Sequence, residues 1–224
     1  MPEPTVRAVL LDLWDTLAWN EWPPFRDRVA ERSGLSVERL RRALMQTLRL
    51  RNRGTYPDGA ADWAAVFAAA GIDPVDQLGA EVAAMEADQL SRDAHLFDDS
   101  VPTLRRLRAA GLRTAVVSNC SHSTRPVVDR LLLAGEADAI VLSVEVGSVK
   151  PEPDIYRAAL AELGAEAQQA VFVDDQVDYC RGAEEVGIRP YLIRRGRPTW
   201  DDQDPPDPAG FAVIASLQEL PVGT

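Results

Sequence analysis

The first apolar run of the chain stops at a carboxylate. Val9, Leu10 and Leu11 follow one another without polar alternation, and Asp12 ends the run. An unbroken apolar run is typical of a strand buried on both faces, as in a parallel sheet. Because binding crevices in open α/β sheets lie beyond the carboxyl ends of the strands, the position of Asp12 indicates a ligand site. A capping role for Asp12 is the alternative.

Helical periodicity dominates the next part of the chain. Helical patterns cover residues 26–32, 37–48, 60–70 and 75–90. Gly34 stops the first pattern, and Ser36 is placed to cap the second. The sequence therefore predicts a block of helices without strands, residues 20–94, inserted after the first strand.

Strands and helix-length segments alternate in the second half of the chain. Short apolar runs occupy residues 114–117, 140–143, 170–173 and 190–193. Such alternation predicts βαβ units around a parallel sheet. We therefore predict an α/β core domain built from residues 1–19 and 95–224, with the helical block as a second domain.

The overall charge is acidic, since 24 basic residues against 35 acidic ones give a formal charge of −11. This charge disfavours a surface for nucleic acid or anionic membrane, so we expect a small-molecule partner. Two cysteines are too few for a disulfide framework. The first residues lack the positive charge of a signal peptide, and no apolar run approaches about 18 residues. We expect a cytoplasmic protein, either a monomer or a homodimer.

Polar side chains follow three later strands. They are Ser118 and Asn119, Lys150, and the pair Asp174 and Asp175. In a parallel sheet these groups meet Asp12 at one edge. A nucleophilic carboxylate, a hydroxyl and an amide that hold an anion, a lysine and an acidic pair are what phosphoryl transfer through an aspartyl-phosphate needs. The acidic pair would hold Mg²⁺.

The four segments resemble the motifs of the haloacid dehalogenase superfamily, most of whose members are phosphatases. LLDLWDTL resembles the first motif, Ser118-Asn119 the second, VEVGSVKPEPDIYRAAL the third and VFVDDQVDYCRGAEEVGI the fourth, in the family's order. The resemblance implies a Rossmann-like α/β core with an inserted all-helical cap, which closes over the site, excludes water and selects substrates.

The resemblance also implies a role for each site residue. The catalytic group consists of Asp12 as nucleophile, Lys150 as the neutralising cation, and Thr16 and Ser118 as hydrogen-bonding partners of the phosphate. Mg²⁺ would be held by Asp12, Asp174, Asp175 and the main-chain carbonyl of Trp14, and the substrate would contact Trp14 and Asn119. These roles describe a Mg²⁺-dependent phosphatase of a small phosphorylated metabolite.

Two positions depart from the family's pattern. Phosphatases of the family carry a proton-transferring aspartate two residues after the nucleophile, where this chain has Trp14. By strand alternation, Asp15 should not point where Trp14 points. Tyr179 replaces a carboxylate or amide of the fourth motif, and Asp178 beside it is either a substitute ligand or a surface residue. Losing a general acid costs about 10² to 10⁴ in rate, so we expect a slow phosphatase that favours leaving groups needing little protonation.

Two other functions remain open. A 2-haloacid dehalogenase releases a halide without a proton, so an aromatic side chain at Trp14 suits it, whereas the acidic pair does not suit a carboxylate substrate. A non-catalytic binding protein of the same family would also tolerate the two departures. The intact Asp12, Thr16, Ser118 and Lys150 speak against it.

Arginines crowd one predicted cap helix and its end. They are Arg39, Arg41, Arg42, Arg49, Arg51 and Arg53. Such a cluster either attracts an anionic substrate or forms a solvated face, and the sequence favours the solvated face.

Overall fold

A six-stranded parallel sheet forms the centre of the computed structural model, which describes residues 5–197 and 207–221. The strands, in spatial order, are β5 (Ala139–Leu142), β4 (Arg113–Ser118), β1 (Ala8–Leu11), β6 (Ala170–Asp174), β7 (Arg189–Ile193) and β8 (Ala212–Ile214). β1 pairs in parallel with β4 and β6, which places Leu11 beside Val116 and Val173. The predicted α/β fold is confirmed. β8 was not predicted, although it lies in the short apolar run of residues 211–215.

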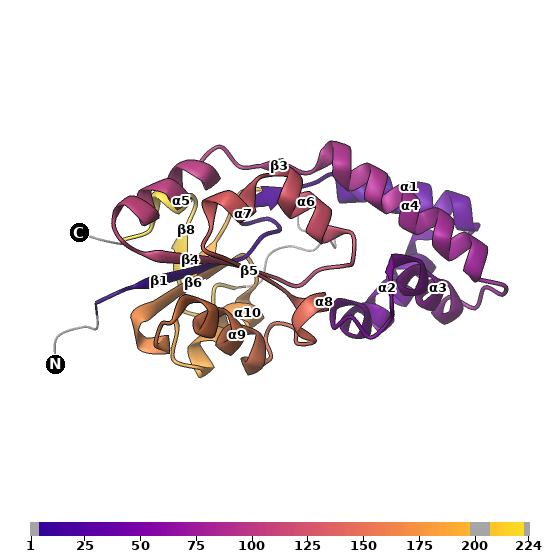
Figure 1. Cartoon of the computed structure of the whole chain (residues 1–224). Helices are drawn as coiled ribbons and strands as arrows, with labels where there is room; N and C mark the ends of the chain where they lie inside the picture. The colour runs from indigo at the N-terminus through magenta and orange to yellow at the C-terminus, as the bar shows by residue number, and fades with distance from the viewer. Residues whose placement is uncertain (1–4, 198–206, 222–224) are drawn as a thin grey trace.

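Helices cover both faces of the sheet (Figure 1). One face packs against α5 (Ser100–Ala109), α6 (Thr124–Arg130) and α7 (Leu133–Glu136), and the other against α9 (Pro153–Leu163) and α10 (Val177–Glu185). Strand alternation divides β1 between them: Val9 and Leu11 join the first core cluster, and Ala8 and Leu10 join the second. Short helical segments complete the core domain at α8 (Ser143–Val146), η1 (Ala167–Gln169) and η2 (Leu217–Glu219).

Four helices form the inserted cap. They are α1 (Trp22–Ser33), α2 (Val37–Asn52), α3 (Gly59–Ala69) and α4 (Asp76–Asp93). As expected, Gly34 ends α1 in the left-handed conformation at φ 68°, and the Ser36 side chain caps α2 by accepting a hydrogen bond from the Arg39 amide. The cap has its own apolar core, built around Phe25, Leu40 and Phe67.

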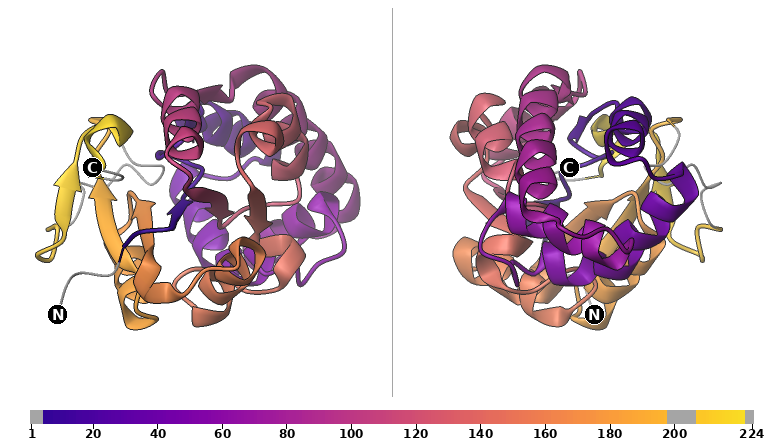
Figure 2. Two further views of the ribbon diagram at one scale, coloured as in Figure 1. Left: turned by 60° about the vertical axis from the view of Figure 1, so that its left-hand side comes forward. Right: turned by 90° about the vertical axis from the view of Figure 1, so that its right-hand side faces the viewer.

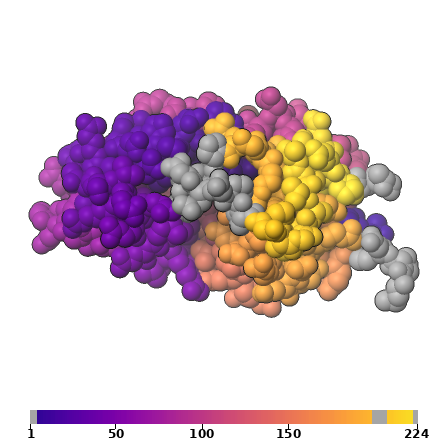
Figure 3. Space-filling model, turned by 180° about the vertical axis from the view of Figure 1, so that it is seen from behind, coloured from indigo at the N-terminus to yellow at the C-terminus, as the bar shows by residue number. Residues whose placement is uncertain are grey.

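The cap lies beyond the carboxyl ends of the strands (Figures 1 and 2), and the space-filling view shows it as a lobe beside the core domain (Figure 3). Two short strands, β2 (Ala18–Trp19) and β3 (His95–Leu96), pair antiparallel where the chain leaves the core and where it returns. Both passages between the domains therefore lie side by side. Among the described helices, none is long and apolar enough to cross a membrane.

Candidate active site

A buried ion-pair triad lies at the carboxyl edge of the sheet. Asp12 follows β1, Asp174 ends β6, and Lys150 lies in the turn before α9. The Lys150 ammonium donates to Asp12 Oδ1 at 2.5 Å and to Asp174 Oδ2 at 2.6 Å. Lys150 is the sole lysine of the chain, whose other basic residues are arginines. A compact ammonium fits between two carboxylates where a planar guanidinium needs more room.

The turn that carries Lys150 is held from two sides. Asn119 accepts a hydrogen bond from the Lys150 amide at 2.7 Å and donates one to the Lys150 carbonyl at 2.9 Å. On the other side, a Cβ at Gly182 would come within 2.6 Å of the Pro151 Cβ and 2.7 Å of the Pro151 carbonyl oxygen, so α10 packs directly against the turn. Asn119 therefore positions the lysine, in addition to lining the cavity described below.

Burial and charge pull the pKa values of the triad in opposite directions. Burial raises the pKa of Asp12 and that of Asp174, the latter to about 7, while the Lys150 ammonium opposes both shifts. Burial alone would lower the pKa of Lys150, but the charges of Asp12 and Asp174 hold it above its usual value. One lysine cannot neutralise every carboxylate gathered here, so the site holds excess negative charge.

The excess charge fits a divalent cation. Asp12, Asp174 and Asp175 each offer an oxygen, and these oxygens lie within 4.8 Å of one another. Burial and the charges of Asp174 and Asp12 raise the pKa of Asp175 well above its usual range. Each carboxylate already accepts a hydrogen bond: Asp174 from the Gln176 amide and Lys150, Asp12 from Lys150, and Asp175 from the Gln176 side chain. Hard carboxylate oxygens are the ligands that Mg²⁺ prefers.

Two buried hydroxyls lie near the triad. Thr16 is fully buried beside Asp12, where its hydroxyl helps to lower the pKa of the Asp12 carboxyl, although it makes no hydrogen bond of good geometry to any described residue. The Arg195 guanidinium fixes this loop by donating to the Thr16 carbonyl at 2.6 Å. The Ser118 hydroxyl donates a long hydrogen bond, 3.4 Å, to the neighbouring Asn119 carbonyl. Hydroxyls left so poorly satisfied can turn toward a bound anion.

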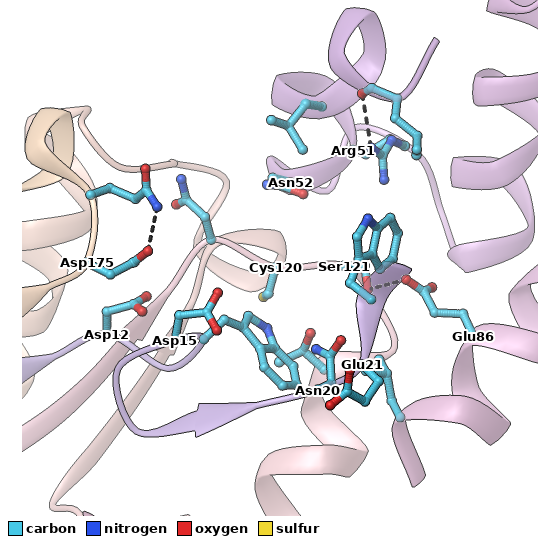
Figure 4. Close-up of a pocket in the computed structure, with 18 of the residues that line it drawn as sticks. Asp12, Asp15, Asn20, Glu21, Arg51, Asn52, Glu86, Cys120, Ser121 and Asp175 are labelled. Carbon is cyan, nitrogen blue, oxygen red and sulfur yellow. Dashed lines mark hydrogen bonds between the residues drawn. The ribbon is translucent and has the colours of Figure 1, made fainter. Parts of the chain in front are cut away.

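A cavity of about 270 Å³ opens between this edge of the core and the cap (Figure 4). Of the predicted site residues, those on its wall are Asp12, Trp14, Asn119 and Asp175, and those behind the wall are Thr16, Ser118, Lys150 and Asp174. The cap side of the wall includes Leu44, Leu48, Arg51, Glu86 and Leu90. The cavity thus joins a charged core end to a largely apolar cap end.

Asp15 and Trp14 both line the cavity, so the expectation from strand alternation is wrong. Asp15 has a φ of 59°, a left-handed conformation that breaks the alternation. Burial and the Asp12 charge raise the pKa of Asp15 to about 6, and Arg197 opposes the shift. Trp14 also packs against the buried cluster of Leu90, Ala94 and Val127.

Tyr179, which departs from the family's fourth motif, lies in the cavity wall. Tyr179 lines the cavity, and its ring lies 5.0 Å from the Lys150 Nζ, a cation–π contact. The Asp178 side chain is largely exposed and pairs with Arg181 at 3.2 Å. Asp178 is therefore a surface residue in this structure and does not join the acidic cluster.

The sequence did not predict the polar contacts between the cap and the core. His122 Nδ1 lies 2.9 Å from Asp62 Oδ2, and Ser123 donates to Glu86 at 3.0 Å. Asp62 and Glu86 are buried cap residues. No sequence pattern marked them, since each contact joins distant segments. Arg51 did carry a signal, because it extends the helical face of Leu44 and Leu48 at the right spacing.

The haloacid dehalogenase-like hydrolase family model matches residues 6–187, which include the four motif segments and the cap but not Arg195 and Arg197. The chain belongs to the haloacid dehalogenase-like hydrolases.

Some relatives of the chain in this family are named as phosphatases and others as dehalogenases. The chain is 26% identical over 210 residues to Phosphatase MT3486 of Mycobacterium tuberculosis, with 88% of this chain and 91% of the relative covered. It is similar in structure to a haloacid dehalogenase phosphatase from Thermococcus onnurineus, with a TM-score of 0.67, 24% identity and 96% of each chain covered. The 2-haloacid dehalogenase from Pseudomonas syringae pv. Tomato DC3000 reaches the same TM-score, with 25% identity and 97% of each chain covered.

Proposed function

We propose that this hydrolase is a Mg²⁺-dependent phosphatase of a small phosphorylated metabolite, with residues 20–94 as its cap. The observation that carries the proposal is the acidic cluster of Asp12, Asp174 and Asp175 beside a single lysine. A dehalogenase substrate is itself a carboxylate, and this excess of negative charge would repel it. The free, buried Cys120 and Cys180 support a cytoplasmic location.

The chain's own residues divide the proposed reaction between them. Asp12 attacks phosphorus, the bond to the leaving-group oxygen breaks, and an aspartyl-phosphate forms that water then hydrolyses. Lys150 holds the Asp12 carboxylate in place and offsets the charge of the substrate, while the hydroxyls of Thr16 and Ser118 turn to the phosphate oxygens. Asp12, Asp175 and the Trp14 carbonyl would hold Mg²⁺, with Asp174 beside them. Bound Mg²⁺ supplies positive charge that keeps the nucleophile ionised and offsets charge on the phosphate.

Proton transfer to the leaving group is the weak part of this machinery. An indole cannot donate a proton at neutral pH, so Trp14 does not supply the general acid. We therefore propose slow turnover that favours aryl or acyl phosphates, whose leaving groups need little protonation.

Phosphate release from a panel of phosphomonoesters, with Mg²⁺ and with EDTA, tests the proposal. We expect release that requires Mg²⁺ and falls at least about 10³-fold in Asp12→Asn, because the nucleophile is lost. Asp178→Asn is the control, since this exposed carboxylate lies outside the cluster. Chloride release from 2-chloropropionate without metal would instead establish the dehalogenase. Failure of beryllofluoride to bind at Asp12 would favour a non-catalytic protein.

A further inference from the structure

Arg51 is a buried cation in the cap wall of the cavity. It lies in the last turn of α2, it is only 7% exposed, and it follows Leu44 and Leu48 along the face that lines the cavity. Figure 4 shows its side chain reaching from α2 to the cavity, on the side remote from Asp12 and Asp175. Of the other arginines in the cluster, Arg39, Arg42 and Arg49 are exposed and Arg41 and Arg53 are half-buried, so Arg51 is the most deeply buried member.

Among the described residues, the Arg51 guanidinium contacts no carboxylate. Its Nε donates to Thr47 Oγ1 at 3.0 Å, and its Nη2 donates to the Leu44 carbonyl at 3.2 Å. Both acceptors are neutral. Within residues 5–197 and 207–221, no carboxylate oxygen lies within 4.0 Å of its nitrogens. A buried cation without a contacting anion is costly, so the site is suited to an anion from outside the chain.

Glu86, the cavity-wall carboxylate whose charge acts most strongly on Arg51, forms its hydrogen bonds with other residues. Its carboxylate accepts from the Ser123 hydroxyl at 3.0 Å, from the Trp63 indole at 3.3 Å and from the Ser121 hydroxyl at 3.4 Å. Asp62 pairs with His122 through Oδ2, while its buried Oδ1 has no hydrogen-bond partner among the described residues. These carboxylates stabilise the charge of Arg51 from a distance, because their charges oppose the lowering of its pKa by burial.

We infer that Arg51 binds a carboxylate at the far end of the substrate, so that the cavity selects phosphomonoesters whose alcohol portion is an apolar chain ending in an acid. The inference rests on the proposed function, because it takes the phosphate to lie at the Asp12 end. Leu44, Leu48 and Leu90 would contact the chain between the two ends. The planar fork of a guanidinium matches the two oxygens of a carboxylate.

A matched pair of substrates tests this selection without any variant. Alkyl phosphates of increasing length are made with either a terminal carboxylate or a terminal carboxamide, which has the same shape and no charge. A hydrogen-bonded charge pair is worth about ten- to a hundredfold in binding. We expect kcat/KM to favour the carboxylate by this factor at the best length, mainly through KM. Equal values for the two series would overturn the inference.

In Arg51→Gln, kcat/KM should fall for the carboxylate series alone, so that the preference over the carboxamide series is lost. Arg42→Gln, an exposed change on the same helix, should keep it. Loss of both series in a folded Arg51→Gln protein, or an unchanged preference, would contradict the assigned role. If neither series is hydrolysed, the proposed function fails by itself, and calorimetric binding of the same unhydrolysed compounds still decides the role of Arg51. Tighter binding of the carboxylate supports the inference, and equal binding refutes it.

Discussion

Lys150 Nζ lies 2.5 Å from Asp12 Oδ1, although 138 positions separate the two residues in the chain. The contact exists because the strand of Asp12 lies next to the strand that ends in Asp174, and Lys150 bridges both carboxylates from a turn. The Lys150 ammonium therefore offsets the repulsion between the Asp12 and Asp174 carboxylates at this edge of the sheet.

Removing Lys150 should destabilise the protein strongly. In Lys150→Met the two buried carboxylates lose their counter-charge, and breaking a buried pair in this way costs about 3 to 5 kcal/mol. Urea unfolding should show this loss at pH 8 and a smaller one at pH 5, where the carboxylates take up protons. Because the chain has a single lysine, ¹⁵N-labelled lysine gives one side-chain signal. That signal should keep its ammonium shift at about pH 10.4, the ordinary pKa of lysine, and a neutral amine there would contradict the triad.

Asp175 belongs to the acidic cluster, whereas Asp178 lies on the surface, so variants of the two residues should differ in their response to Mg²⁺. Asp175→Asn should raise the Mg²⁺ concentration needed for half-maximal activity by about ten- to a hundredfold, because one charged ligand becomes neutral. Asp178→Asn should leave it unchanged, since that carboxylate is exposed and paired with Arg181. Magnesium titrations of phosphate release measure both. If the two variants need the same Mg²⁺ concentration, Asp175 is not a metal ligand.

The identity of residue 14 should set the leaving-group dependence. Across aryl phosphates, we expect rates to fall as the pKa of the leaving phenol rises, because Trp14 donates no proton. Trp14→Asp should flatten this dependence and raise the rate on the poorest leaving groups by about 10²-fold. Thermal unfolding is followed alongside, since Trp14 packs against Leu90 and Val127.

Asp15→Asn is the control for that series, because Asp15 lines the same cavity. We expect it to leave the slope of the dependence unchanged. A steeper slope in this variant would show that Asp15 supplies the proton, and the slow-phosphatase hypothesis would then be wrong.

Glu86→Gln should make stability less dependent on pH. Burial raises the pKa of Glu86, although Ser123, Trp63 and Arg51 oppose the shift. A carboxyl with a raised folded-state pKa binds more protons when folded, so the free energy of unfolding falls by about 1.4 kcal/mol per pH unit between the unfolded pKa, about 4.3, and the folded one. A glutamine keeps an acceptor for the indole and avoids the buried charge.

The melting temperature of Glu86→Gln should therefore exceed that of the parent at pH 8, and the two should converge near pH 4.5. The exposed Glu38→Gln serves as control, since its carboxylate only pairs with Arg42 at the surface. An equal gain at both pH values would mean that the buried charge is not the cause.

The sequence by itself determined the fold class and the residues at the strand ends. Apolar runs such as Val9 to Leu11 and the helical period around Leu40 are local patterns, and a polar residue directly after a buried strand is visible in the chain order. The carboxyl ends of parallel strands share one edge, so the meeting of Asp12 and Asp174 followed from topology, whereas Lys150 reaches them from a turn that follows α8.

Only the tertiary structure decided which side chains face the cavity. The left-handed backbone at Asp15 overrides the alternation that periodicity assumes. Asn119 turned out to brace the lysine turn, and Arg51 is buried on the cavity wall beside Leu48, unlike the exposed Arg42 and Arg49 of the same helix. The contacts of Asp62 and Glu86 with the core depend on how the cap lies over the sheet. Such placements follow from packing between segments far apart in the chain, and no local pattern encodes that packing.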